Sequence, residues 1–87
     1  MIGIITEITD DDVPANGGRP EIKKKIVTID FLNDESAAIE FTGELRRTII
    51  RAFKVGDNVD VEFTTKAHKN KRGKVFNNNK ATSIKRL

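Results

Sequence analysis

The chain has 87 residues, of which 37% are apolar and 33% charged, and its formal net charge is +3. This length and this balance predict one small globular domain over residues 1–87 and exclude a disordered chain. The chain has no cysteine, which excludes disulfides and thiolate metal sites, and it has no apolar run of about 18 residues and no secretory leader pattern, so we expect a cytoplasmic protein that does not span a membrane.

The first predicted element is a strand, "IGIITEIT", at residues 2–9. It is rich in β-branched residues, and Ile2, Ile4 and Ile8 share one parity. A long exposed loop at residues 10–20 follows, because its prolines and its Asn-Gly-Gly run are typical of turns.

Two further strands, at residues 22–32 and 37–42, are separated by the turn sequence "NDES". Apolar and polar residues alternate along both strands, which gives the pair one apolar face, and we expect the two strands to form an antiparallel hairpin. The residues of that face are Val27, Ile29, Phe31, Ile39 and Phe41.

The period then changes to that of a helix at residues 43–54, with Thr42 as its predicted N-cap. Its apolar residues are Leu45, Ile49, Ala52 and Phe53. Alternation returns at residues 55–65, where Val59, Val61 and Phe63 are predicted to point inward. Residues 75–87 predict a weaker last strand, since asparagine is a poor strand former.

The resulting order, β-β-β-α-β-β, resembles the OB-fold, a five-stranded Greek-key barrel with one helix between strands 3 and 4. The segment "FKVGDNVDVEF" resembles the entry to the fourth strand of OB domains. The segment "RGKVFNNNKATSI" resembles the end of a small bacterial family related to single-stranded DNA-binding proteins. The resemblance implies an all-β fold that binds nucleic acid without catalytic residues, through one barrel face and the loops between strands 1 and 2 and between strands 4 and 5.

Charge is sorted along the chain. Residues 1–45 carry ten acids and four bases, residues 46–87 carry three acids and twelve bases, and residues 64–87 carry no acid. The densest basic segment is "KAHKNKRGK", which the fold assignment places in the loop between strands 4 and 5. Its cations fit a phosphate backbone. The predicted phosphate-binding residues of this segment are Lys66, Lys69, Lys71, Arg72 and Lys74. The alternative is a solvated hairpin tip whose lysines discourage edge pairing.

A second basic group, Lys23, Lys24 and Lys25, begins the second strand and is predicted to extend this path, with Arg19 close to it in sequence. Single-strand binders also stack bases on aromatic rings. Phe76 is the one candidate for stacking, with His68 as its assistant, because the other four phenylalanines have core parities.

Other chemistry has little support. The acids of "TDDD" do not have the spacing of a calcium loop, so we expect no metal. One histidine and two serines do not suggest a nucleophile with its base, so we expect no enzyme and no cofactor.

The sequence therefore predicts binding of single-stranded nucleic acid, DNA in preference to RNA, with little sequence specificity, through the basic loop between strands 4 and 5 and the adjoining barrel face. Two alternatives stay open. One is a protein-interaction or assembly module, such as an adaptor subunit or a homo-oligomer, in which the basic half meets an acidic partner. The other is binding of structured RNA.

Overall fold

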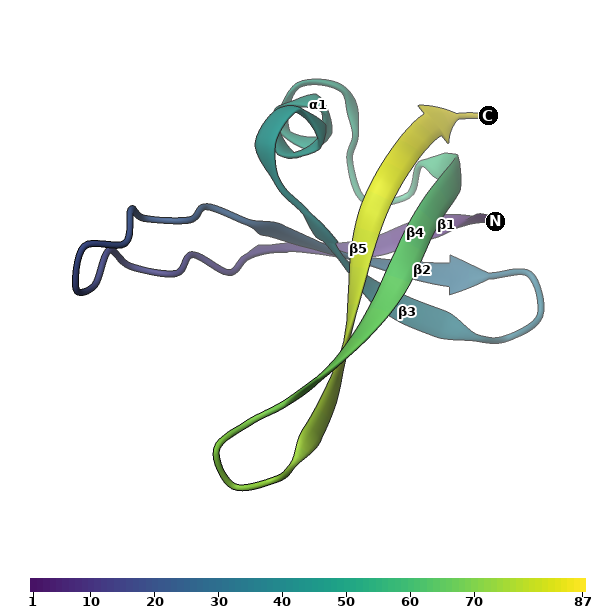
Figure 1. The fold of residues 1–87 in the computed structure, drawn as a ribbon. Coiled ribbons are helices and arrows are strands. Elements are labelled where there is room, and N and C mark those ends of the chain that lie inside the picture. The colour runs from purple at the N-terminus through teal and green to yellow at the C-terminus, as the bar shows by residue number, and fades with distance from the viewer.

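The computed structural model describes residues 1–87 and is mostly β, with five strands and one short helix (Figure 1). The elements are β1 (Ile2–Asp10), β2 (Lys25–Phe31), β3 (Ser36–Phe41), α1 (Gly43–Ala52), β4 (Asn58–Lys69) and β5 (Val75–Arg86). The predicted order β-β-β-α-β-β is confirmed. No helix is both long enough and apolar enough to cross a membrane.

The five strands form one sheet that closes in a ring, in the order β1-β2-β3-β5-β4, with β4 paired to β1. The pairing is antiparallel at every junction except β3 with β5, which is parallel. The predicted hairpin of β2 and β3 is confirmed, with Val27 opposite Ile39. The helix lies between β3 and β4 in sequence and covers one end of the ring (Figure 1).

The core lies inside the ring and comes from the alternating apolar residues of the strands. Every residue that was predicted to face inward from the second and third strands is buried. Val59 and Val61 are fully buried, and Phe63 is half-buried and stacks on Phe31 with ring centroids 6.3 Å apart. The complete set of buried apolar residues is Ile5, Val27, Ile29, Phe31, Ile39, Phe41, Ile49, Val59, Val61 and Ala81.

In β1 the parity shared by Ile2 and Ile4 faces solvent, and Gly3 and Ile5 face the core. A bulge between Ile5 and Glu7 then changes the parity. Gly3 sits where strands approach closely, because a Cβ built on it would lie 2.5 Å from the carbonyl oxygen of Asp30. Packing across the ring therefore decided which side of this strand is buried.

The helix is amphipathic, as predicted, with Ile49 buried and Leu45 and Phe53 packed against the core. Ala52, which was predicted for the same face, is exposed at the last turn. Thr42 occupies the N-cap position with extended backbone, but its side chain makes no capping hydrogen bond. The helix is therefore held by the contact of its apolar face with the ring.

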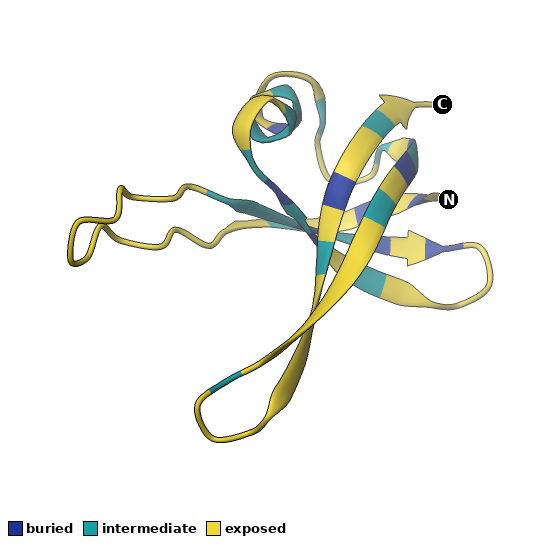
Figure 2. Ribbon diagram, viewed as in Figure 1, coloured by how far each residue is buried: buried dark blue, intermediate teal, exposed yellow.

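Two hairpin-like projections leave the ring and consist almost entirely of exposed residues (Figure 2). The first is the loop at residues 11–24, which carries only two isolated bridges, Val13 with Ile22 and Asn16 with Arg19. The second is the outer half of the β4–β5 hairpin. We call residues 64–80 the arm.

Candidate nucleic-acid interface

The arm is a two-stranded β-ribbon, and this corrects the predicted loop at residues 66–74. Strand β4 continues to Lys69 and β5 begins at Val75, so only residues 70–74 form the turn. The pairing is unbroken from Thr64 opposite Lys80 to Lys69 opposite Val75. The asparagines of β5 extend the strand although they are poor strand formers, because each one is paired to β4.

The turn at the end of the arm is organised by the side chain of Asn70. Its Oδ1 accepts hydrogen bonds from the backbone N–H groups of Arg72 and Lys74, each at 2.9 Å. Gly73 has φ of +80°, a conformation that favours glycine, and its N–H donates to the carbonyl of Asn70 at 3.0 Å. The turn therefore holds the cationic residues of the tip in a defined conformation.

The register divides the arm into two faces, because directly opposed residues of an antiparallel pair share a face. The outer face continues the outside of the ring and consists of Thr64, Lys66, His68, Phe76, Asn78 and Lys80. The inner face continues the side of Phe63 and Ala81 and consists of Thr65, Ala67, Lys69, Val75, Asn77 and Asn79. The predicted phosphate-binding residues are thus distributed over both faces and the tip.

The outer face brings together three of the predicted site residues. The rings of His68 and Phe76 lie 5.6 Å apart at 32°, and Nζ of Lys74 lies 5.3 Å from the centroid of Phe76. The side-chain amide of Asn78 lies 3.3 Å from Nδ1 of His68. Phe76 is 38% exposed, so part of its ring is open to a ligand. A partly open aromatic ring beside a cation suits the stacking of a base next to its phosphate.

Positive charge on the arm is not neutralised. The arm carries six cations and no acid, and none of the six takes part in an ion pair within the chain. Lys80, which the sequence did not single out, belongs to this set because the register places it opposite Thr64 on the outer face. Its signal in the sequence was the absence of acids from residue 64 onward. Unpaired cations on a narrow projection attract polyanions.

The second predicted basic group is largely neutralised, which limits the predicted extension of the path. Nζ of Lys24 lies 3.1 Å from Oε1 of Glu40, and Nζ of Lys25 lies 2.6 Å from Oδ1 of Asp10. Both lysine side chains are about four-fifths buried, whereas Lys23 is exposed and unpaired. The hydrogen bond from Lys25 holds the pKa of Asp10 below its usual value. Only Lys23 of the three is therefore a free cation.

Glu40 links these lysines to the arm. It lies on β3 in register with Lys80 of β5, and its carboxylate binds Lys24. The three side chains thus cross the outside of the sheet from β5 over β3 to the start of β2. One acid therefore interrupts an otherwise cationic route from the arm to the second strand.

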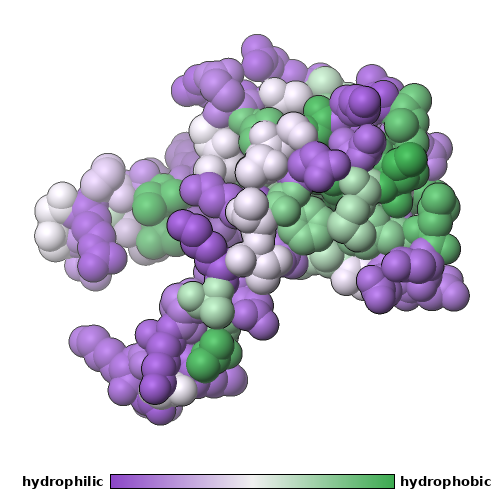
Figure 3. Space-filling model, turned by 45° about the vertical axis from the view of Figure 1, so that its right-hand side comes forward, coloured by the Kyte–Doolittle hydropathy of each residue, from purple (hydrophilic) through white to green (hydrophobic).

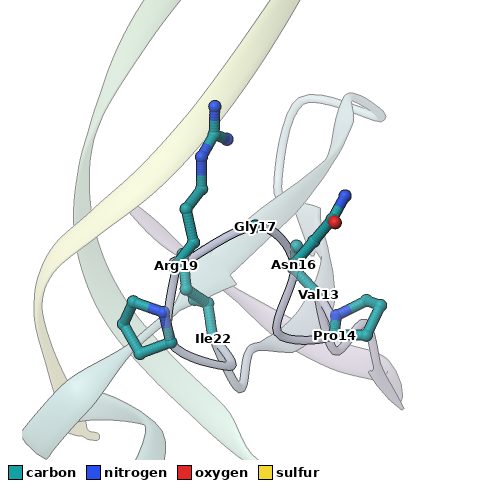
Figure 4. Close-up of a pocket in the computed structure, with 7 residues that line it drawn as sticks. Val13, Pro14, Asn16, Gly17, Arg19 and Ile22 are labelled. Carbon is teal, nitrogen blue, oxygen red and sulfur yellow. The ribbon is translucent and has the colours of Figure 1, made fainter.

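The loop at residues 11–24 surrounds a hollow of about 410 Å³ (Figure 4). All residues that line it belong to the loop itself, and the only charged one is Arg19, whose side chain extends away from the loop backbone. No set of polar groups converges in the hollow, and no group of three His, Cys, Asp or Glu side chains elsewhere is placed to hold a metal ion. Arg19 and Lys23 therefore remain as isolated cations of this projection.

A different surface lies on the outside of β1. Ile2 and Ile4 are 44% and 42% exposed, Leu32 is 82% exposed, and acids adjoin them, since Asp60 is opposite Ile2 and Asp30 opposite Ile4. We call these five residues the apolar acidic face. Figure 3 shows that apolar surface gathers on the body, while the arm is mostly hydrophilic.

Comparison with known proteins gives no match to a family model, to a curated protein or to a solved structure. The function is therefore inferred from the charge, faces and contacts of the arm.

Proposed function

We propose that this chain is a non-catalytic OB-fold protein that binds single-stranded nucleic acid, more specifically DNA, with little sequence preference. The single observation that carries this proposal is the arm, which presents six unpaired cations and no acid on an exposed ribbon. The ring order with one parallel junction and the helix between β3 and β4 support the OB-fold assignment.

In the proposed complex the single strand of nucleic acid lies along the outer face of the arm. Lys66, Lys74 and Lys80 contact phosphates, and a base stacks on the open part of Phe76 beside His68. The path continues over the outside of β3 toward Lys24, where the ligand competes with Glu40 for the ammonium group. Because phosphate contacts and stacking do not distinguish bases, little sequence preference is expected.

Fluorescence anisotropy with labelled single-stranded DNA, single-stranded RNA and duplex, each titrated at several salt concentrations, tests the proposal. Phosphate contacts by Lys66, Lys74 and Lys80, with Lys24 as the fourth, give a slope of log K against log salt of about −2.8 on a single strand. Binding that does not respond to salt, or no binding to any single strand at low salt, contradicts the proposal.

The apolar acidic face favours a second candidate function, self-association. It combines exposed aliphatic side chains with Asp30, an acid without an ion pair, whereas Asp60 binds the N-terminal ammonium group of Met1 at 2.9 Å. The arm of a second copy offers cations that complement Asp30, together with the exposed Val75 and Phe76. In this alternative the arm binds a neighbouring molecule of the same chain.

Sedimentation velocity at low salt, with and without oligo(dT), separates the two functions. Self-association through the arm gives species larger than the monomer that dissociate when oligo(dT) is added, since both ligands use the same cations. A monomer at all protein concentrations that binds oligo(dT) supports the first function alone.

A further inference from the structure

We infer that the tip of the arm enters the major groove of duplex DNA, so that the preferred ligand is a junction between a single strand and a duplex. This inference rests on the proposed function, because it uses the same arm. It adds a second mode of contact at the tip, with Arg72 as the residue that reads a base.

The distribution of charge over the arm is the first observation. A single strand that follows the outer face contacts Lys66, Lys74 and Lys80, and it leaves Lys69 on the inner face without a phosphate. A groove has a phosphate wall on each side. A ribbon with cations on both faces is therefore complementary to a groove in a way that it is not complementary to one strand.

The dimensions of the arm agree with this placement. The major groove of B-DNA is about 12 Å wide and about 8.5 Å deep, and it admits a two-stranded ribbon. Paired strands lie about 4.8 Å apart, and at about 3.3 Å per residue the groove depth corresponds to about two and a half residues along each side of the ribbon. It therefore accommodates the turn and about the first paired residue of each strand. That length brings Lys69 to one wall and Lys74 to the other, while Lys66 and Lys80 stay outside for a single strand.

The construction of the tip is the third observation. Arg72 lies in the turn, its side chain is exposed, and its guanidinium makes no hydrogen bond or ion pair within the chain. The bond from its backbone N–H to Asn70 and the left-handed Gly73 hold the turn in place. A guanidinium presented at the end of an ordered ribbon has the geometry for a bidentate contact with O6 and N7 of guanine.

The test compares three probes by anisotropy: oligo(dT), a blunt duplex containing guanines, and the same duplex with an oligo(dT) tail. We expect the tailed duplex to bind tighter than either of the other probes. A tailed duplex that binds no tighter than oligo(dT) of equal tail length overturns the inference and leaves single-strand binding intact. If no probe binds, the proposed function fails as well.

Base reading is tested with a tailed duplex in which 7-deazaguanine replaces guanine, which removes the N7 acceptor and keeps the pairing. We expect the unmodified tailed duplex to bind about tenfold tighter than the modified one. Arg72→Lys keeps the positive charge but replaces the guanidinium, which can donate two parallel hydrogen bonds, by a single ammonium group. The variant should therefore bind the two tailed duplexes equally well, and its affinity for oligo(dT) should be unchanged. Lys71→Arg is the matched control and should keep the ratio. A ratio of one for the unaltered protein, or a ratio that Arg72→Lys does not change, overturns the assignment of Arg72.

Discussion

Removing the three cations that the single strand is proposed to contact should weaken single-strand binding by about two orders of magnitude. The variant is Lys66→Ala, Lys74→Ala and Lys80→Ala together. All three side chains are exposed, and none of them makes an ion pair, so the substitutions leave no acid without its partner.

The magnitude follows from counterion release. Each phosphate contact on a single strand contributes about 0.7 to the slope of log K against log salt, so at 0.1 M salt it contributes about 0.7 log unit relative to 1 M. Three lost contacts therefore lower affinity by up to about 100-fold, or about 3 kcal/mol, and make the slope shallower by about 2.

The assay is anisotropy of labelled oligo(dT) over a salt series, with thermal unfolding to verify that the variant is folded. A matched control is Arg51→Ala, Lys54→Ala and Lys85→Ala, which removes three exposed and unpaired cations outside the arm. Both variants have the same net charge. An equal loss of affinity in the two variants would refute the reasoning, because net charge and not the arm would then attract the strand.

Four further predictions concern the sheet, the core and the ion pairs. Glu40→Gln removes the acid that interrupts the cationic route, so it should tighten oligo(dT) binding in the same anisotropy assay; weaker binding would place the strand elsewhere. Gly3→Ala forces a methyl group against the neighbouring strand and should lower stability by about 1 to 3 kcal/mol, or roughly 4 to 20 °C in Tm. Ile49→Ala should cost about 2 to 5 kcal/mol by urea unfolding, whereas its exposed neighbour in Ile50→Ala should stay within about 0.5 kcal/mol. The pKa of Asp57 is lowered, so its contribution to stability is present above the ordinary carboxyl pKa and is lost as pH falls through the lowered value; the Tm advantage of the unaltered protein over Asp57→Asn should therefore shrink between about pH 5 and about pH 2.

The pKa of Asp57 is lowered by two contacts of its carboxylate. One is with Lys54, in the same connection between α1 and β4, and the other is with Arg86 at the end of β5. Oδ2 of Asp57 accepts a hydrogen bond from the backbone N–H of Lys54 at 2.9 Å and lies 3.1 Å from Nη2 of Arg86. The carboxylate form is therefore favoured by a hydrogen bond and by a nearby cation.

The sequence determined the elements and most of the core. Alternation in residues 26–31 and 58–63 identified the inward residues correctly, because the side chains of a strand point alternately to opposite faces wherever one face is buried. The change to helical spacing of the apolar residues at residue 43 identified the helix, because residues three and four apart lie on one face of a helix. The positions of the charged residues in the sequence revealed that the chain from residue 64 onward contains cations and no acid.

Tertiary structure decided the features that depend on partners distant in the chain. The buried side of β1 follows from the close approach of β2 at Gly3, the neutralisation of Lys24 follows from Glu40 on the next strand, and the arm is a ribbon because β5 pairs with β4 out to Lys69. A basic segment with the composition of a loop does not reveal such pairing, since local preference for a strand is weak in asparagine and lysine. Cross-strand hydrogen bonds supply what local preference lacks, and they alone place the cations on two faces and a tip.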